Sequence, residues 1–313
     1  SMSVWRNYLV FAFLMLVPIS VAVVILFRPG DWLPRVEVIV PIADGLAINA
    51  YLQKIGFNDI ANNPGTLQAV PRLRISRLPR KISEAWRENS ALRKSVFFRV
   101  SLSAALQANE QILRQRHRLL GLSGLAPGNL SSGDRAWLTT MLDRYRVTTS
   151  ANPDNPINPD RLAELSRRMD ALPPSLTIVQ GAIESAWLQS RFAREGQAIF
   201  GQWTTGKGGL KALESDARLA TFNNPHDALI AYMLNINTHP AYEGLRRARA
   251  EMRRKGQILE GYVLAGFMSD YAATGQDYVD LIRQMIRRNH LSKFDSAKLS
   301  QGPRILFQMA DPD

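Results

Sequence analysis

The chain has 313 residues, of which 46% are hydrophobic and 21% are charged. This balance is typical of a globular protein and excludes a largely disordered chain, and the length suits one large domain or two ordinary ones. Cysteine is absent, which excludes disulfide bonds and thiolate metal sites. The four histidines are scattered singly, so the sequence predicts no metal site and no cofactor.

The net charge is +12 at pH 7, and arginines gather over residues 72–80 and 246–254. Such clusters attract polyanions, among them nucleic acid, anionic lipid and cell-wall polymers, and a solvated helix face gives the same pattern. No recognition helix, zinc motif or RNA-binding signature accompanies the charge. Nucleic acid is therefore not predicted as a partner.

The N-terminal region contains an uncharged run over residues 7–27. As a helix it would span roughly 30 Å, the thickness of the hydrocarbon core of a bilayer. Trp5, Tyr8 and Trp32 lie at its two ends, where interfacial aromatic side chains are common. A cleavable signal peptide is the alternative, but its apolar core is usually shorter. The sequence predicts a transmembrane helix over residues 7–27, preceded by residues 1–6 as a cytoplasmic stub that includes a tag remnant.

Residues 28–81 follow as a juxtamembrane region. Within it, residues 36–41 predict a short strand, and residues 46–57 predict a short amphipathic helix. Residues 58–81 are rich in asparagine, proline and arginine, which favours irregular structure. We therefore expect a largely extended region between the membrane helix and the remainder of the chain.

The rest of the chain is predicted to be mainly helical. Over residues 82–171 apolar side chains recur at helical spacing, which indicates a helical N-terminal region. Residues 172–291 predict a helical domain interrupted by a glycine-rich stretch, residues 201–222, that favours a hairpin or a small β lobe. Residues 292–313 form a largely polar C-terminal tail.

The helix expected over residues 174–190 contains a single charged residue, Glu184. On a helical wheel the apolar residues fill about half the circumference, and small or polar residues fill most of the rest. This pattern predicts a helix buried nearly all round, with one carboxylate facing a neighbour. A buried carboxylate is costly and its pKa usually rises. An ion pair with Arg191 or Arg194 is the other interpretation of the helix taken alone.

Several separated stretches of the chain form one set of motifs, in a fixed order. They are "KSVFFRVSLSAALQANEQILRQRHRLL", "PPSLTIVQGAIESAW", "SRFAREG", "FGQW", "NINTHPAYEGLRRARAEMR" and "LAGFMSDYAATGQDYVDLIRQMIRRN". Together they resemble the Bax-like glucosaminidases of glycoside hydrolase family 73, which are lysozyme-like peptidoglycan hydrolases. The resemblance covers residues 94–291. It implies a lysozyme-like α+β catalytic domain with a small β lobe. With the helical region and the N-terminal transmembrane helix predicted before this domain, we expect a mainly α protein.

The resemblance implies a set of site residues. It assigns the catalytic acid of the family to Glu184 and the tyrosine that lines the site to Tyr271, with Tyr278 as the second tyrosine of the same motif. The second carboxylate of the family lies on the β lobe, where Glu214 and Asp216 are the candidates. The candidates for substrate binding, several of which suit core packing equally well, are Trp187, Phe200, Gln202, Trp203, Tyr232, Tyr242 and Tyr278.

Two departures from the family pattern lie close to Glu184. Leu188 and Gln189 stand where the family usually has Gly-Thr, which predicts a narrower cleft. Gln197 and Ala198 stand where the family usually has Asn-Asn, which predicts the loss of a hydrogen bond to sugar or backbone.

The chemistry agrees with these residues, because glycosidic cleavage requires a carboxylic acid that protonates the leaving oxygen. Apolar surroundings can raise the pKa of Glu184 enough for that role. The sequence thus predicts a membrane-anchored endo-β-N-acetylglucosaminidase that cuts the peptidoglycan backbone. If Glu214 or Asp216 acts as the base, the reaction inverts. Attack by the N-acetyl group of the substrate, assisted by Tyr271, is the alternative mechanism.

The predicted substrate also indicates where in the cell the protein is located. Peptidoglycan strands lie outside the cytoplasm, so we expect a single-pass protein of the bacterial inner membrane with its catalytic domain in the periplasm. Arg6 on one side of the membrane segment and Arg28 and Arg35 on the other barely favour either orientation. A protein of the membrane or of wall synthesis is a further candidate partner.

Three other functions compete with this one. A lytic transglycosylase has the same fold and an equivalent glutamate, but it usually carries a "GA-GLMQ" segment where this chain has "QAIFGQW". A non-catalytic wall-binding or scaffold protein in the membrane would explain the two departures near Glu184. A nucleic-acid binder rests on charge alone.

Overall fold

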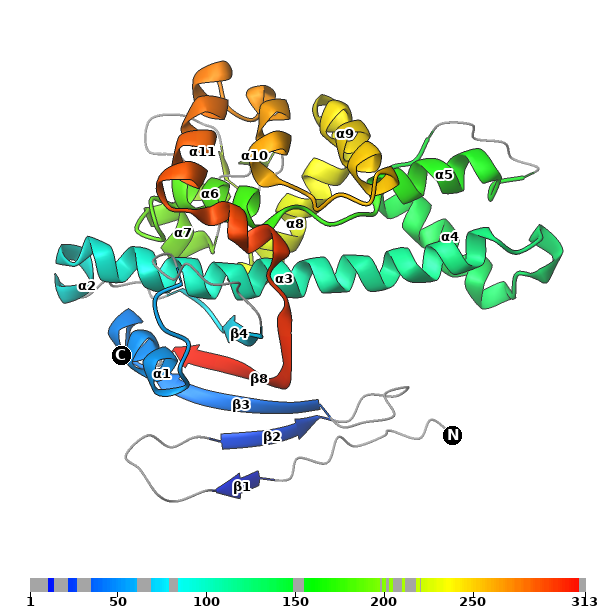
Figure 1. Cartoon of the computed structure of the whole chain (residues 1–313). Coiled ribbons are helices and arrows are strands. Elements are labelled where there is room, and N and C mark those ends of the chain that lie inside the picture. The colour runs from blue at the N-terminus through cyan, green and yellow to red at the C-terminus, as the bar shows by residue number, and fades with distance from the viewer. Residues whose placement is uncertain are drawn as a thin grey trace. The chain divides into compact units, whose positions relative to one another are not determined.

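The structure is a computed structural model of the chain (Figure 1). It describes residues 11–13, 22–26, 35–60, 69–78, 84–148, 155–197, 199–200, 203–204, 210–211, 218–219 and 221–309. The chain divides into two compact units, each built from separated segments. The sheet unit contains Ser1–Ala104, Gly181–Ala228 and Ala297–Asp313. The helical unit contains Ala105–Gln180 and Leu229–Ser296.

A five-stranded sheet organises the sheet unit, in the order β1-β2-β3-β8-β4 (Figure 1). The strands are β1 (Phe11–Phe13), β2 (Ala22–Leu26), β3 (Arg35–Ile42), β4 (Val70–Ile75) and β8 (Leu299–Met309). Strand β8 comes from the C-terminal end of the chain and lies between β3 and β4, parallel to both. In this register Phe307 is opposite Val40 on one side and Ile75 on the other.

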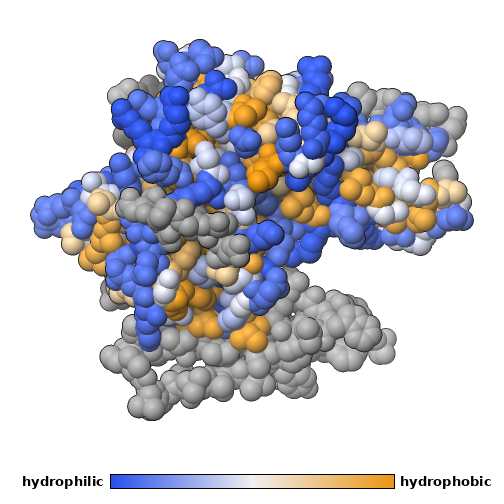
Figure 2. Space-filling view, in the orientation of Figure 1, coloured by the Kyte–Doolittle hydropathy of each residue, from blue (hydrophilic) through white to orange (hydrophobic). Residues whose placement is uncertain are grey.

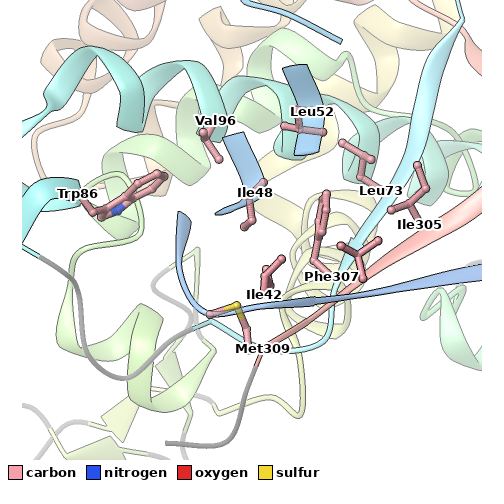
Figure 3. Close-up of a cluster of buried hydrophobic side chains, with 10 residues drawn as sticks. Ile42, Ile48, Leu52, Leu73, Trp86, Val96, Ile305, Phe307 and Met309 are labelled. Atoms are coloured by element: carbon pink, nitrogen blue, oxygen red, sulfur yellow. The ribbon is translucent and has the colours of Figure 1, made fainter. Parts of the chain in front are cut away.

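The core of the sheet unit is apolar (Figure 3). Alternate residues of a strand point to the same face of a sheet, and Ile305, Phe307 and Met309 of β8 are all buried. Helix α1 (Gly45–Lys54) covers this cluster with Ile48 and Leu52. Asp44 caps the helix by accepting hydrogen bonds from the amides of residues 46 and 47, each 3.0 Å long. The strand and helix predicted over residues 36–41 and 46–57 are confirmed as β3 and α1.

The transmembrane helix expected over residues 7–27 does not appear among the described residues. The two described segments of that range are strands β1 and β2, and β2 pairs antiparallel with β3. Residues 22–26 read AVVIL, and β-branched side chains suit a pleated strand as well as an apolar helix. The other residues of the expected helix lie outside the described residues. No helix in the described part of the chain is long and apolar enough to cross a membrane.

A second, small sheet confirms the β lobe predicted over residues 201–222. Its strands are β5 (Trp203–Thr204), β6 (Leu210–Lys211) and β7 (Arg218–Leu219), in the order β5-β7-β6. Strand β7 pairs antiparallel with both of its neighbours. The sheet unit further contains the short helices α2 (Glu84–Glu88) and α7 (Arg191–Gly196).

Helices build the rest of the chain, and three of them contribute residues to both units: α3 (Ser90–Ser123), α6 (Pro174–Ser185) and α8 (Pro225–Thr238). The helical unit adds α4 (Ser132–Arg144), α5 (Pro159–Arg168), α9 (Glu243–Arg254), α10 (Gly261–Leu264) and α11 (Gln276–Arg288). Short 3₁₀ turns lie at Pro127–Asn129, Pro240–Tyr242, Ala265–Phe267, Ser269–Tyr271 and Leu291–Ser296. Ser131, Asn158 and Asn224 cap the N-termini of α4, α5 and α8, because their side chains accept hydrogen bonds from the amides of residues 134, 161 and 227.

The helical unit is held together by a buried carboxylate and its arginines. Asp170 accepts hydrogen bonds from Arg253 at 3.1 and 2.9 Å. Arg249, fully buried beside it, donates to main-chain oxygens of residues 167, 168, 170 and 171 and to the side chain of Asn237. Burial alone would raise the pKa of Asp170, but the bonds from Arg253 and the charges of Arg249 and Arg116 hold it below its usual value.

This network shows that the arginine cluster over residues 246–254 is not simply a solvated surface. Arg246 and Arg249 are buried, and Arg246 donates to the carbonyls of residues 236 and 239. Part of the cluster is therefore structural, and only its outward members are available to an anionic partner. Figure 2 shows hydrophobic side chains interspersed among hydrophilic ones on the visible surface, and Val263, Phe267 and Leu281 are among the exposed apolar residues of this unit.

Candidate active site

Helix α6 carries Glu184 as its second-to-last residue. Residues 174–182 are all buried, as expected of a helix buried nearly all round, and Glu184 itself is half-buried. The helix ends at Ser185, five residues before the end of the predicted range, because the next three residues are left-handed. The helix begins at Pro174, as the proline pair in the sequence predicted. The carboxylate is thus presented at the end of a helix whose other residues are fixed by burial.

The start of α6 is tied to two other segments by Asp295. Its carboxylate accepts hydrogen bonds from the amide and hydroxyl of Ser175, at 2.9 and 2.8 Å, and from the amide of Gly261, at 2.9 Å. Only glycine fits at Gly261, because a side-chain carbon there would lie 2.7 Å from the amide nitrogen of Leu176 and closer still to Ser175. Burial raises the pKa of Asp295 to about 6 despite these bonds.

The chain turns sharply after Glu184. Ala186, Trp187 and Leu188 have φ angles of 48°, 59° and 67°, in the left-handed region that residues other than glycine rarely adopt. The turn is closed by hydrogen bonds from the amides of Trp187 and residue 190 to the carbonyls of residues 182 and 185, both 3.0 Å long. Each such residue costs about 1–2 kcal/mol, and strain of this kind gathers at functional sites.

The turn shows why glycine is usual in the family at the first departure, and what leucine changes there. Leu188 occupies a left-handed position, to which the glycine usual in the family is suited without strain. Its amide donates to the hydroxyl of Ser185 at 2.9 Å, so the backbone keeps the turn although the residue is unfavourable for it.

Trp187 lies within an aromatic cluster of the sheet unit. Its ring meets Phe97 and Phe98 edge to face, with centroids 5.4 and 5.5 Å apart, and the Lys94 ammonium lies 5.1 Å from the ring centroid. The ring is half-buried. These contacts fix the position of Trp187, and a role in substrate binding remains a prediction.

Three of the predicted tyrosines gather around a fourth, Tyr271, in the helical unit. The Tyr271 ring stacks on Tyr278, with centroids 5.6 Å apart and an interplanar angle of 9°. The rings of Tyr232 and Tyr242 lie 6.3 Å from Tyr271. Tyr232, Tyr242 and Tyr278 are buried, whereas Tyr271 is half-buried. Burial, followed by the charge of Asp270, raises the pKa of Tyr242 to about 12, so this phenol stays protonated near neutral pH.

Sequence reasoning missed Gln180, which links two of these tyrosines. Its side chain is fully buried, accepts a hydrogen bond from the Tyr232 hydroxyl and donates one to the Tyr278 oxygen at 3.3 Å. Gln180 precedes Glu184 by four residues, so the two side chains share one face of α6. The signal was present in the sequence, because a glutamine in a helix buried nearly all round needs polar partners.

Phe200 and Trp203 are the other predicted site residues in the part of the chain that the structure describes. Phe200 is buried. Trp203 contributes its main chain to β5. Gln202, Glu214, Asp216 and Ala198 lie outside the described residues. Gln197, the other half of the second departure, accepts a hydrogen bond from the amide of Leu78 at 2.7 Å within the sheet unit. The part of the chain that the structure describes contains no cluster of histidine, aspartate and glutamate able to hold a metal ion.

Comparison with known proteins identifies the class. Residues 160–291 match the glucosaminidase family model, described as mannosyl-glycoprotein endo-beta-N-acetylglucosaminidase. The chain therefore carries a glucosaminidase domain and is a glycoside hydrolase. Its mostly helical structure with a small sheet is consistent with a lysozyme-like domain of this kind.

Within this class the chain is similar to the Bax-like glucosaminidases, as its motifs indicated. It is 28% identical over 204 residues to Protein bax from Escherichia coli (strain K12), an alignment that covers 63% of this chain and 70% of that protein. A solved structure, the catalytic domain of the autolysin Auto from Listeria monocytogenes, is 13% identical and covers 57% of this chain and 96% of its own. Its TM-score of 0.30 is too low to guide a comparison of the folds.

Proposed function

We propose that the chain is a membrane-anchored peptidoglycan hydrolase that cleaves the glycan backbone at N-acetylglucosamine, with Glu184 as the general acid. The observation that carries the proposal is the setting of Glu184, at the end of a buried helix and before three left-handed residues. The glucosaminidase domain at residues 160–291 supports the reaction class. The lysozyme-like plan implied by the motifs and the uncharged run over residues 7–27 support the rest.

In this mechanism the Glu184 carboxylic acid donates its proton to the leaving oxygen as positive charge develops on the sugar. The second group is either a carboxylate of the β lobe, Glu214 or Asp216, or the N-acetyl group of the substrate assisted by Tyr271. Tyr271 is well suited to assist, because three other tyrosines hold its ring while it stays half-buried.

The direct test is digestion of purified peptidoglycan by the full chain, with fragments weighed by mass spectrometry. Fragments with N-acetylglucosamine at the reducing end are expected. Anhydro-muramic ends would replace the proposal with a lytic transglycosylase, and an absence of fragments would favour a wall-binding scaffold.

Glu184→Gln keeps the shape of the side chain but cannot donate the proton, so we expect turnover to fall by about 10²–10⁴-fold. Its thermal unfolding midpoint should stay nearly unchanged. Glu195→Gln, the same chemical change at an exposed position of α7, is the matched control and should keep full activity. Wild-type turnover in Glu184→Gln would contradict the catalytic role of Glu184 and favour an ion pair instead.

The anchor and its orientation need a separate test. A reporter fused after Asp313 should be active only if it is of an extracytoplasmic type, because the proposed substrate lies outside the cytoplasm. A signal from a cytoplasmic reporter alone would contradict this part of the proposal and leave the reaction class untouched.

A further inference from the structure

Gln180 uses both ends of its amide inside the tyrosine cluster. The carbonyl oxygen accepts the proton of the Tyr232 hydroxyl, and the amide nitrogen donates to the Tyr278 oxygen at 3.3 Å. All three side chains are buried, so water does not compete for these bonds. A buried donor or acceptor left without a partner is costly, so both bonds stabilise this arrangement.

The two bonds give the tyrosines opposite roles. Tyr232 donates its hydroxyl hydrogen bond to Gln180. Tyr278 accepts a hydrogen bond from Gln180, so its own hydroxyl hydrogen must point elsewhere. A primary amide is the side chain that can impose both roles at once, because it has one donating and one accepting end. A carboxylate would accept from both tyrosines, and an apolar side chain would bond to neither.

The rings of Tyr278 and Tyr232 both contact Tyr271, so the hydrogen bonds of Gln180 are linked to that residue. The Tyr278 ring stacks nearly parallel on Tyr271, and the Tyr232 ring lies against the same residue at 70°. Fixing the hydroxyls of Tyr278 and Tyr232 therefore fixes the two surfaces between which Tyr271 is held. Glu184 lies one turn further along α6, so the helix that carries the carboxylate also carries the residue that orders the tyrosines.

We infer that Gln180 is a positioning residue, which sets the hydroxyl orientation of Tyr278 and Tyr232 and thereby the placement of Tyr271. Its effect on catalysis rests on the proposed function, in which Tyr271 lines the site. Its effect on the tyrosines does not, because that effect follows from hydrogen bonds within the helical unit.

The test compares Gln180→Met and Gln180→Glu in the full chain. Gln180→Met removes both bonds at nearly constant volume, so kcat on peptidoglycan should fall by about 10- to 100-fold while KM changes little, since misplaced groups act mainly on the chemical step. Asn109→Leu is the matched control. That buried amide also uses both ends, bonding to the main chain of Leu172, and its loss should lower the unfolding midpoint without lowering kcat.

Gln180→Glu supplies a readout that packing alone would not change. As a carboxylate the new side chain accepts from both tyrosines and reverses the Tyr278 hydroxyl, whereas as a carboxylic acid it donates to Tyr278 as the amide does. Because burial raises the pKa of a carboxyl group, the activity of this variant relative to wild type should rise as the pH falls. A constant ratio across pH, or wild-type kcat in Gln180→Met, overturns the inference.

Nuclear magnetic resonance of ring-labelled tyrosines separates this inference from the proposed function. Gln180→Met should shift the ring signals of Tyr271 and Tyr278, and Asn109→Leu should leave both in place. If the wild-type chain cleaves no peptidoglycan, the proposed function fails while the spectra still decide the positioning role. Unshifted Tyr271 signals in Gln180→Met would reject that role.

Discussion

The helical unit buries a carboxylate together with its arginines, whereas the central cluster of the sheet unit is apolar (Figure 3), and this unit buries Arg99 outside that cluster. Asp170 and Arg249 are only 2% and 0% exposed; the Asp170 carboxylate lies 4.0 Å from Arg249 and accepts hydrogen bonds from Arg253, and Arg249 donates to main-chain oxygens. Leu73 and Phe307 are equally buried but depend on shape and volume alone. The helical unit should therefore be sensitive to the loss of a charge partner, and the sheet unit to the loss of volume.

The largest effect is expected at Arg249. Arg249→Met leaves Asp170 buried with fewer compensating charges, so the free energy of unfolding should fall by about 4 kcal/mol. Chemical denaturation measures the loss. Arg247→Met is the control on the same helix, because Arg247 is exposed and its contact with Glu243 is 3.8 Å long; it should change stability by less than about 0.5 kcal/mol. Equal effects at the two positions would contradict the role given to the buried network.

The corresponding change in the sheet unit is Leu73→Ala, which opens a cavity beside Ile305 and Phe307 of β8. We expect a loss of about 3 kcal/mol in the free energy of unfolding. Leu73→Met keeps the volume and should cost less than about 1.5 kcal/mol. If the two substitutions cost the same, volume does not govern this core and the contrast between the units fails.

The units should also respond to pH with opposite signs. Burial, followed by the charges of Arg74 and Arg304, lowers the pKa of His226 in the sheet unit from 6.5 to about 4. Neutral His226 therefore stabilises the fold above pH 6.5, and this stability is lost as the pH falls towards 4. The pKa of Asp295 in the helical unit is raised from 3.8 to about 6. Its contribution is greatest at low pH and falls as the pH rises through 6.

Single substitutions separate the two contributions. In His226→Gln the contribution of Asp295 is no longer opposed by that of His226, so relative to wild type the free energy of unfolding should fall between pH 4 and 6 by on the order of 1 kcal/mol. In Asp295→Asn the contribution of His226 is no longer opposed by that of Asp295, and stability relative to wild type should rise over the same range. Urea titrations at several pH values test both slopes. A wild-type pH dependence in either variant would show that the substituted group is not responsible for it.

The smallest effect concerns the strained turn after Glu184. Leu188→Gly relieves a left-handed side chain, and the gain of about 1 kcal/mol is partly offset by the greater flexibility of the unfolded chain. A net stabilisation of about 0.5 kcal/mol is expected from thermal unfolding. Leu188→Ala keeps the backbone strain and should not stabilise the protein. Stabilisation by alanine would instead indicate that the leucine side chain is unfavourable where it packs.

Much of the local structure was predictable because its signals lie within a few residues of one another. A serine at 131 or 132 was recognisable as a helix cap, and Ser131 fills that role, while alternating glycine-rich segments indicated the β lobe over residues 201–222. The uniform apolar character around Glu184 correctly predicted a buried helix. The motif set also predicted the glucosaminidase class, because several separated stretches in order are specific where one short motif is not.

Long-range arrangement was not predictable from these signals. The pairing of β8 with β3 and β4 joins the two ends of the described chain, and a polar tail gives no local indication of its partner. The apolar run over residues 7–27 satisfied the pattern of a membrane helix, yet its described segments pair as strands. An apolar segment rich in β-branched residues suits either structure, and the surroundings decide between them.

The sequence by itself predicted which side chains would carry the chemistry, and it determined their order along the chain and the helix that holds Glu184. Only the tertiary structure brought Tyr232, Tyr242, Tyr271 and Tyr278 together and made Gln180 the hydrogen-bond partner of both Tyr232 and Tyr278. It likewise buried Arg249 and left Arg247 exposed within one cluster of arginines. The physical reason is that caps and helical periodicity follow from contacts within a turn of the chain, whereas a buried polar group is stabilised by partners that only packing brings near.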